Sequence, residues 1–356
     1  MIVVNARFLT QQITGVQRYA IELSVRLKER MGEEVAFVTP RNIVMHDVAK
    51  QLGAVVVGSH TGYLWEQWDL PLWLKKRGSP LLLCLCNLAP VFYHNKITVI
   101  HDILFTWKHI ANHNLREALY RHLFPMIMKT SRHLVTVSEF SRQDVCTKMG
   151  IDSDKFSIVP GANANYFKKR DAESRLMEEK YFFAMGRVNA KSKNLRRTLE
   201  AFDLLCKDVK DVKLYLGGYD LTPETFKAYG LDNFLLNKRV ELKGKITNDE
   251  LIDLYSNAIA FVYPSLGDGF GIPPLEAQSC DCPVIISNFM SLPEIYGESG
   301  LLCNPWSPDD IADKMKMVYE DQELREQLIR KGRENVKRFS FDKSADKLIE
   351  IISKYE

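Results

Sequence analysis

Short apolar runs rich in valine and isoleucine alternate with amphipathic stretches along the whole chain. Each run is typical of a buried strand, whereas the stretches between them carry the three-to-four-residue spacing of a helix. Continuous apolar strands that alternate with helices predict a parallel sheet covered on both faces. Seven strands are predicted to begin near residues 2, 35, 54, 81, 97, 133 and 156, with helices over 16–30, 114–131 and 140–149.

The same alternation of strand and helix patterns begins again in the second half of the chain. Six more strands are predicted near residues 181, 212, 240, 258, 283 and 300, with helices over 194–208, 247–256 and 273–280. The charged stretch 166–180 lacks a strand pattern and is the natural linker. The pattern therefore predicts two doubly wound α/β domains, 1–166 and 167–340, followed by a final helix over 341–356. Ser307, followed by Pro308, is predicted to begin a helix before that.

Composition adds a broad class and a compartment. The 356 residues are 46% hydrophobic and 26% charged, which is enough to form two buried cores. Seven cysteines form no disulfide or zinc framework, the N-terminus lacks a signal-peptide layout, and the most apolar stretch is too short to cross a membrane. These features predict a cytoplasmic protein.

Charge is distributed unevenly between the two halves. Residues 1–165 hold 19 Lys and Arg against 13 Asp and Glu, or +6, and the remaining 29 against 32 give −3, for the net +3. A basic first half fits a phosphate-bearing or membrane-surface partner about as well as it fits chance. No basic–aromatic module indicates nucleic-acid binding.

The stretch GDGFGIPPLEAQSC, residues 267–280, carries the strongest chemical pattern. Gly269 and Gly271 let the backbone approach a ligand closely, and the two following prolines suit a helix start. Glu276 is predicted to lie in the first turn of that helix and to accept hydroxyl hydrogen bonds from a ribose, while Asp268 faces a second polyol. The amides left for the ligand are those of Phe270, Gly271, Ile272 and Leu275. A helix-capping role for both acids is the competing interpretation.

Two cations and a glycine follow other predicted strands. Arg187 and Lys193 straddle the turn after the strand at 181, where they can neutralise a diphosphate without a metal. Gly15 opens the first helix, where a phosphate can approach the free N–H groups of the first turn. An exposed charge pair and an ordinary helix cap are the alternative interpretations.

These segments together resemble the family 4 retaining glycosyltransferases of GT-B fold. PSLGDGFGIPPLEAQSCDCPVIIS is similar to the family's donor-site motif, and NARFLTQQITGVQRYAIEL, TVIHDIL, LVTVSEFSRQDV, FAMGRVNAKSKNLRRTLEAF and VELKGKITNDELIDLYSNA resemble family segments in the expected order. The resemblance covers essentially the whole chain. It implies two Rossmann-like domains facing a cleft, the first binding the acceptor and the second the nucleotide sugar, with the helix 341–356 crossing back to the first.

The resemblance also implies a role for each candidate residue. Glu276 matches the acid that holds the ribose, and Asp268 the acid that contacts the donor sugar. Arg187 and Lys193 match the pair that binds the departing diphosphate, Gly15 the glycine near the distal phosphate, and His101 a histidine facing the donor sugar. No metal or cofactor is expected. The family usually has Glu in place of Asp268, and commonly Gly in place of Asp281, a position where Asp is tolerated if φ is positive.

The implied function is transfer of a sugar, with retention, from a nucleotide diphosphate sugar to a glycan or lipid-linked glycan. The N-terminal segment looks most like bacterial surface-polysaccharide mannosyltransferases, which favours GDP-mannose. A UDP-sugar donor and an inactive sugar-nucleotide-binding subunit remain alternatives, whereas a dinucleotide oxidoreductase is disfavoured because G-x-G-x-x-G is missing after the first strand. The amphipathic stretch 114–132 indicates either a helix packed on the sheet or peripheral membrane contact.

Overall fold

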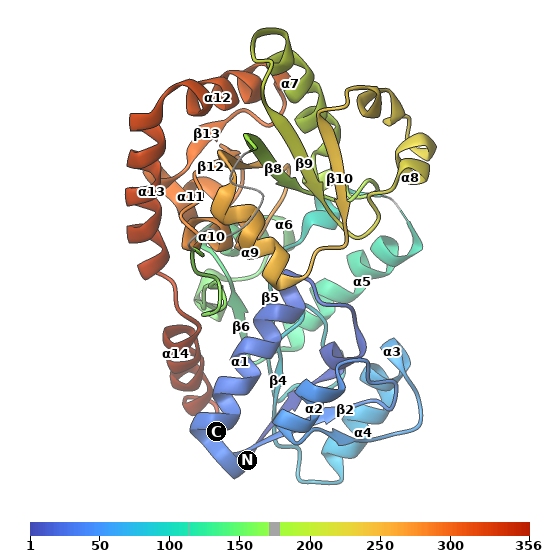
Figure 1. Cartoon of the computed structure of the whole chain (residues 1–356). Helices are drawn as coiled ribbons and strands as arrows, with labels where there is room; N and C mark the ends of the chain where they lie inside the picture. The colour runs from blue at the N-terminus through green and yellow to red at the C-terminus, as the bar shows by residue number, and fades with distance from the viewer. Residues whose placement is uncertain (113, 171–178) are drawn as a thin grey trace. The chain divides into compact units, whose positions relative to one another are not determined.

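The computed structural model describes residues 1–112, 114–170 and 179–356. It divides into two compact units (Figure 1). The first unit holds residues 1–107, 111–162 and 339–356, and the second holds 108–110 and 163–338. Residues 171–178 of the predicted linker lie outside the described residues. The acceptor and donor roles of the two domains stay predictions.

The first unit is built on a seven-stranded sheet in which every pairing is parallel. The strand order is β3-β2-β1-β4-β5-β6-β7, so the chain reverses its direction of travel between β1 and β4. The strands are β1 (Ile2–Asn5), β2 (Val35–Thr39), β3 (Val55–Val56), β4 (Leu81–Cys84), β5 (Lys96–Ile100), β6 (His133–Thr136) and β7 (Phe156–Ile158). Near-continuous burial along the central strands explains their unbroken apolar runs.

Helices and short 3-10 turns connect these strands. The helices are α1 (Gly15–Met31), α2 (His46–Leu52), α3 (Gly62–Leu64), the π-helical turn η3 (Trp65–Asp69), α4 (Leu70–Lys75), α5 (Leu115–Thr130), α6 (Glu139–Met149) and α14 (Phe341–Ser353). The 3-10 turns are η1 (Arg7–Thr10), η2 (Gly32–Glu34), η4 (Leu104–Thr106) and η5 (Ser153–Lys155). The C-terminal α14 packs along α1 (Figure 1), where Arg26 Nε lies 3.1 Å from Asp342 Oδ1. The last helix of the chain thus belongs to the core of the first unit.

The second unit has a six-stranded sheet, again parallel throughout, in the order β10-β9-β8-β11-β12-β13. Its strands are β8 (Tyr181–Met185), β9 (Lys213–Gly217), β10 (Val240–Gly244), β11 (Ala260–Tyr263), β12 (Val284–Ser287) and β13 (Leu301–Cys303). Here the order reverses between β8 and β11. In open parallel sheets such a switch point opens a crevice at the carboxyl ends of the strands.

The helices of the second unit cover both faces of this sheet. They are α7 (Leu195–Asp208), α8 (Pro223–Ala228), α9 (Asn248–Asn257), α10 (Ile272–Ser279), α11 (Leu292–Tyr296), α12 (Pro308–Glu320) and α13 (Gln322–Lys337), with 3-10 turns η7 (Lys191–Lys193), η8 (Asp232–Leu236) and η9 (Gly297–Ser299). Helices α7 and α12 pack together, and their Phe202 and Met315 are fully buried in the same apolar core. Ser307 caps α12 as predicted, accepting a hydrogen bond of 3.2 Å from the amide of Asp310.

The two predicted parallel sheets are confirmed, and each predicted strand and helix is present in the described residues. The sequence pattern missed several short helices, among them the continuous helical stretch from Gly62 to Lys75. That stretch is rich in tryptophan and leucine on every face, so it has no clear helical period.

Candidate functional site

The strongest cluster of predicted residues lies at the switch point of the second unit. Lys193 follows β8, and Asp268 follows β11, its neighbour in the sheet. Their side chains meet directly, with Lys193 Nζ 2.9 Å from Asp268 Oδ1 and 3.3 Å from Oδ2. The structure thus brings a predicted phosphate-binding cation and a predicted sugar-binding acid into one ion pair.

Two further side chains, neither of which is marked by a sequence motif, fix this ion pair. Tyr263, at the end of β11, accepts a hydrogen bond of 2.5 Å from Lys193 Nζ. Burial, and then the charge of Asp268, raise the pKa of the Tyr263 hydroxyl well above its usual value, so the phenol stays neutral. Ser265 donates to Asp268 Oδ2 at 2.5 Å. Asp268 therefore has a defined orientation despite being one methylene shorter than the glutamate of the family.

Asn194 holds three loops of this edge together. It has the left-handed conformation, φ 55° and ψ 33°, at the boundary between the Lys191–Lys193 turn and α7. Its buried amide donates to the carbonyl of Pro264 at 2.9 Å and to that of Pro305 at 2.7 Å. Asparagine tolerates this backbone conformation better than most residues. Its bonds set where the preceding Lys193 projects.

Gly271 fixes the start of α10. Its φ is +86°, and an added Cβ would lie 2.5 Å from Leu292 Cδ2, so both backbone and packing require glycine here. Tyr296 donates a hydrogen bond to its carbonyl. The preceding Gly269 and Phe270 complete the loop, and Ile272 is the first helical residue. The amides of this loop are thereby held at the carboxyl end of the sheet, next to Asp268.

Glu276 is the fifth residue of α10 and is 5% exposed. The prediction that it lies in the first turn is wrong, because α10 begins at Ile272, one residue before the two prolines. A proline without N–H is tolerated throughout the first turn, so the pair need not mark the helix start. The carboxylate stays buried one turn further along the same helix.

Asp281 shows why a departure from the family pattern is tolerated. Its φ is +58°, so the condition under which Asp is tolerated at this position is met. Arg333 makes two parallel contacts with its carboxylate, at 2.6 and 2.7 Å. Asp281 therefore joins the loop after α10 to α13, and its role is structural.

Arg187 lies on the loop after β8 and is about half exposed. Its Nε is 3.8 Å from Asp220 Oδ2, a long ion pair for which an arriving phosphate can compete. The structure shows no contact between Arg187 and the Lys193–Asp268 pair within the described residues.

His101 and Gly15 belong to the first unit. His101, just after β5, is 7% exposed, and its Nε2 lies 2.9 Å from the carbonyl oxygen of Leu85. Because a carbonyl only accepts, Nε2 carries the proton and Nδ1 is the acceptor. Burial lowers the pKa of His101 to about 4, outweighing the opposite effect of the Leu85 carbonyl. Tyr19 packs edge-on against the ring, with centroids 4.8 Å apart.

Gly15 is the first residue of α1, as predicted. The preceding Thr14 is the N-cap, and its amide donates to Gln17 Oε1 at 3.2 Å. The side chain of Gln17 in turn donates to Gln11 at 2.7 Å. This capping box satisfies the amide of Thr14. Anion binding at the first-turn amides of α1 stays a prediction.

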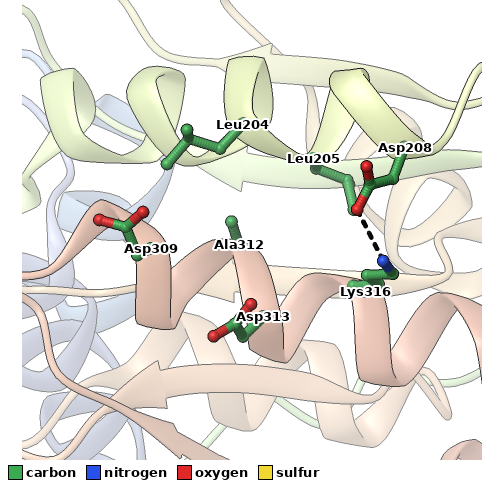
Figure 2. A pocket seen from close by; sticks show the side chains of 7 residues that line it. All are labelled: Leu204, Leu205, Asp208, Asp309, Ala312, Asp313 and Lys316. Atoms are coloured by element: carbon green, nitrogen blue, oxygen red, sulfur yellow. Dashed lines mark hydrogen bonds and ion pairs between the residues drawn. The ribbon is translucent and has the colours of Figure 1, made fainter.

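A surface pocket between α7 and α12 lies outside this set of residues (Figure 2). It is lined by Leu204, Leu205, Asp208, Asp309, Ala312, Asp313 and Lys316, and the Lys316 ammonium is 2.6 Å from Asp208. Its acids, Asp208, Asp309 and Asp313, belong to α7 and α12 rather than to the loops that follow the strands. Across the described residues no group of three or more His, Cys, Asp or Glu side chains is arranged to hold a metal ion. Within the same residues, no helix has both the length and the apolarity needed to cross a membrane.

Two doubly wound parallel sheets form the architecture of the GT-B fold, and a cation, acids and a glycine loop lie at the switch point of the second. The Glycosyltransferase Family 4 model matches residues 13–162, and the model named Glycosyl transferases group 1 matches residues 166–335. The chain belongs to these glycosyltransferases, with one model matching each half of the chain.

Its relatives include O-antigen enzymes. The chain is 27% identical to the O-antigen chain mannosyltransferase RfbU of Salmonella typhimurium over 96% of each protein. It is 28% identical to O-antigen chain mannosyltransferase B of Escherichia coli over 71% of this chain and 70% of the relative.

Solved structures share the fold over nearly the full length. Sucrose-phosphate synthase from Thermosynechococcus elongatus is 18% identical with a TM-score of 0.79, covering 99% of this chain and 98% of that one. Anabaena HepE, in complex with UDP-glucose, is 14% identical with a TM-score of 0.78 and 99% coverage of both chains.

The buried neutral His101 predicts a pH-dependent stability. Between pH 6.5 and about 4 the unfolded histidine binds a proton that the folded one does not, so stability falls as the pH is lowered through this window. Over the whole window, the free energy of unfolding falls by roughly 3 kcal/mol because of His101. Urea unfolding of His101→Gln, which can keep the donor to Leu85, should show a smaller loss than the wild type between pH 7 and pH 4.5.

His46→Gln is the matched control, because His46 is exposed. It should follow the wild-type pH dependence. If the free energy of unfolding fell by the same amount between pH 7 and pH 4.5 in the wild type and in His101→Gln, the assignment of a buried neutral imidazole would be contradicted.

Proposed function

We propose that this chain is a metal-independent, retaining hexosyltransferase that uses GDP-mannose in the synthesis of a bacterial surface polysaccharide. The acceptor is a hydroxyl of a glycan or lipid-linked glycan. The observation that carries the proposal is the Lys193–Asp268 pair at the switch point of the group 1 domain. The choice of mannose rests on the two O-antigen mannosyltransferase relatives.

The second unit supplies groups suited to each part of a nucleotide sugar. Glu276 is assigned to the ribose, whose two hydroxyls one carboxylate can accept. The loop amides after Asp268, together with Arg187 and Lys193, are assigned to the diphosphate. A positioned cation and fixed amides stabilise the charge that develops as the diphosphate leaves.

The geometry of Lys193 fits two tasks at once. An ammonium has three N–H donors, and here one is directed to Tyr263 and another to Asp268. The third is left for a phosphate oxygen. Asp268 then remains oriented toward the donor sugar while its partner holds the leaving group.

The proposed reaction is a same-face displacement. The acceptor oxygen attacks the anomeric carbon, the bond from that carbon to the diphosphate breaks, and a departing phosphate oxygen takes the acceptor proton. His101, assigned to the donor sugar, is neutral at pH 7, so its Nδ1 can accept a hydrogen bond from a sugar hydroxyl.

Nucleotide binding tests the donor site first. GDP at about 100 times its dissociation constant should stabilise the wild type by about 2.7 kcal/mol without added metal. Glu276→Gln should weaken GDP binding about 10-fold or more, since it loses a charged acceptor. Thermal shifts and calorimetry with GDP, UDP, ADP and CMP measure both effects.

Glu298→Gln is the control, because the Glu298 side chain is 87% exposed. A preference for UDP would replace GDP-mannose by a UDP-sugar. No stabilisation by any of the four nucleotides would refute the donor site.

Turnover tests the chemistry and separates it from binding. Lys193→Met should lower kcat by about 10²–10³-fold, the usual effect of removing one group that stabilises developing negative charge. Chelation with EDTA should leave kcat unchanged, and proton NMR of the first product formed should show the anomeric configuration of the donor. Lys316→Met, on α12, is the control. GDP binding without any sugar transfer or donor hydrolysis would instead favour the inactive sugar-nucleotide-binding subunit.

We also propose that the first unit contacts the cytoplasmic face of an anionic membrane through the helical stretch Gly62–Lys75. Leu64, Trp68 and Leu72 recur every four residues along it and are 56%, 61% and 45% exposed. Lys75 ends the stretch, Lys76 and Arg77 follow it, and all three are exposed. An apolar stripe with basic residues beside it is typical of helices that lie in a membrane interface.

The acids of this stretch face inward. The side chains of Glu66 and Asp69 are 1% and 8% exposed, so the outer surface carries positive charge. By contrast, α5, for which sheet packing and membrane contact were the two interpretations, buries Phe124, Ile127 and Met128 in the core. This burial supports the packed-helix interpretation for the C-terminal half of α5. Contact at Gly62–Lys75 would keep a lipid-linked acceptor near the first unit.

Vesicle binding tests the membrane contact. The wild type should sediment with phosphatidylcholine vesicles that contain phosphatidylglycerol, and Trp68 fluorescence should shift to the blue. Changing Lys75, Lys76 and Arg77 together to Gln should weaken binding about 10-fold or more, at roughly 1 kcal/mol per charge. Leu236→Ser, at an 80% exposed site in the second unit, is the control. Equal sedimentation with pure phosphatidylcholine, or none with either, would contradict the proposal.

A further inference from the structure

The switch point of the first sheet holds a polar cluster to which the proposed chemistry assigns no role. Asn5 ends β1, Arg7 follows two residues later, and Glu66 reaches the same place from the π-helical turn η3. Asn5 Nδ2 donates to Glu66 Oε1 at 2.6 Å, and its Oδ1 accepts from the amide of Arg7 at 3.2 Å. Parallel sheets bind ligands at such points, and π-helical turns are frequent at functional sites.

Arg7 is buried without enough hydrogen-bond partners. It is 9% exposed, and its Nε lies 3.2 Å from Glu66 Oε1, close enough for an ion pair but not directed as a hydrogen bond. Its two terminal nitrogens donate to no other side chain or carbonyl in the described part of the chain. Among the described residues, Nε is the Arg7 nitrogen that is buried without a partner, which is costly. The terminal nitrogens reach solvent, so they can donate to a further oxygen ligand.

Glu66 likewise has a buried oxygen without a hydrogen-bond partner in the part of the chain that the structure describes. Its Oε2 is buried and accepts no hydrogen bond from any described residue. The side chain is 1% exposed, and in the described part of the chain Arg7 is the cation that forms an ion pair with it. The two residues therefore form a pair of zero net charge whose hydrogen-bonding capacity is partly unused.

An aromatic face lies against this pair. The Arg7 guanidinium carbon is 5.2 Å from the ring centroid of Tyr63, which is 37% exposed. The Tyr63 hydroxyl is 3.0 Å from that of Tyr120 on α5, and this contact steadies the ring. A half-exposed ring beside planar hydrogen-bonding groups suits a sugar, which has both hydroxyls and a C–H face.

We propose that Arg7 and Tyr63 bind a neutral hexose of the acceptor glycan, with Glu66 as the positioning residue that holds Arg7 and cancels its charge. Arg7 donates to sugar hydroxyls, and the Tyr63 ring packs on the sugar. Charge compensation makes a hydroxyl-bearing neutral sugar a better ligand than a phosphate or an acidic sugar. This inference rests on the proposed transferase function and names the acceptor class that it uses.

The test measures transfer from GDP-mannose to octyl glycosides. The neutral probes are the octyl glycosides of mannose, glucose, galactose and N-acetylglucosamine, and octyl glucuronide is the anionic probe. Wild type should use a neutral probe with a lower KM than the glucuronide. Arg7→Lys, which loses the planar fork, should raise KM for that probe about 10-fold or more, with kcat little changed and the Kd of GDP unchanged.

Matched variants guard against a merely structural effect. Arg26→Lys alters another buried arginine of the same unit and should leave the acceptor KM unchanged. Tyr63→Phe keeps the ring and should retain affinity, whereas Tyr63→Ser should lose it; the exposed site makes both compatible with folding. Glu66→Gln leaves the Arg7 charge uncompensated and should shift preference toward octyl glucuronide, which simple loss of structure would not do.

The outcomes separate this inference from the transferase function. An acceptor KM unaffected by Arg7→Lys and Tyr63→Ser, with normal GDP binding, overturns the inference and leaves the transferase intact. A wild type that prefers the glucuronide, or uses none of the neutral probes, overturns the choice of a neutral sugar. A wild type that binds no nucleotide refutes the proposed function itself.

Discussion

The constraint on which the rest of the structure depends is that every strand pairing in both sheets is parallel. Each strand must then return through a crossover, so the loops that follow the strands gather at one edge of each sheet. At the switch points, β8–β11 in the second unit and β1–β4 in the first, neighbouring loops diverge to opposite faces. The polar clusters around Lys193 and Arg7 both lie at these two places.

The two clusters solve the burial of charge in the same way. Lys193 pairs with Asp268 and is braced by a neutral Tyr263, while Arg7 pairs with Glu66 and is braced by Asn5. In each, an opposite charge and a neutral hydrogen-bonding group offset part of the cost of desolvation. In each pair the cation also has N–H groups that the described neighbouring side chains do not use. A side chain that binds a ligand needs such groups.

Backbone conformation, as well as charge, holds the loops at the carboxyl edge of the second sheet in place. Asn194 and Gly271, at the starts of α7 and α10, both have positive φ, and each is tied to neighbouring loops by buried contacts. Tertiary contacts rather than helix propensity therefore set where Lys193 and the loop amides point. The shorter acid at position 268 is accommodated because Ser265 and Lys193 both donate hydrogen bonds to its carboxylate.

The sequence by itself determined the two parallel sheets, because buried parallel strands need unbroken apolar runs, and it indicated the glycine loop and acids, because residue type limits their chemistry. Only the tertiary structure decided that Lys193 and Asp268 form one pair, that Glu276 lies a turn beyond the start of α10, and that Arg7 meets Glu66. Those contacts join residues from 59 to 75 positions apart along the chain. Strand order and loop packing set such distances, and no local pattern encodes either.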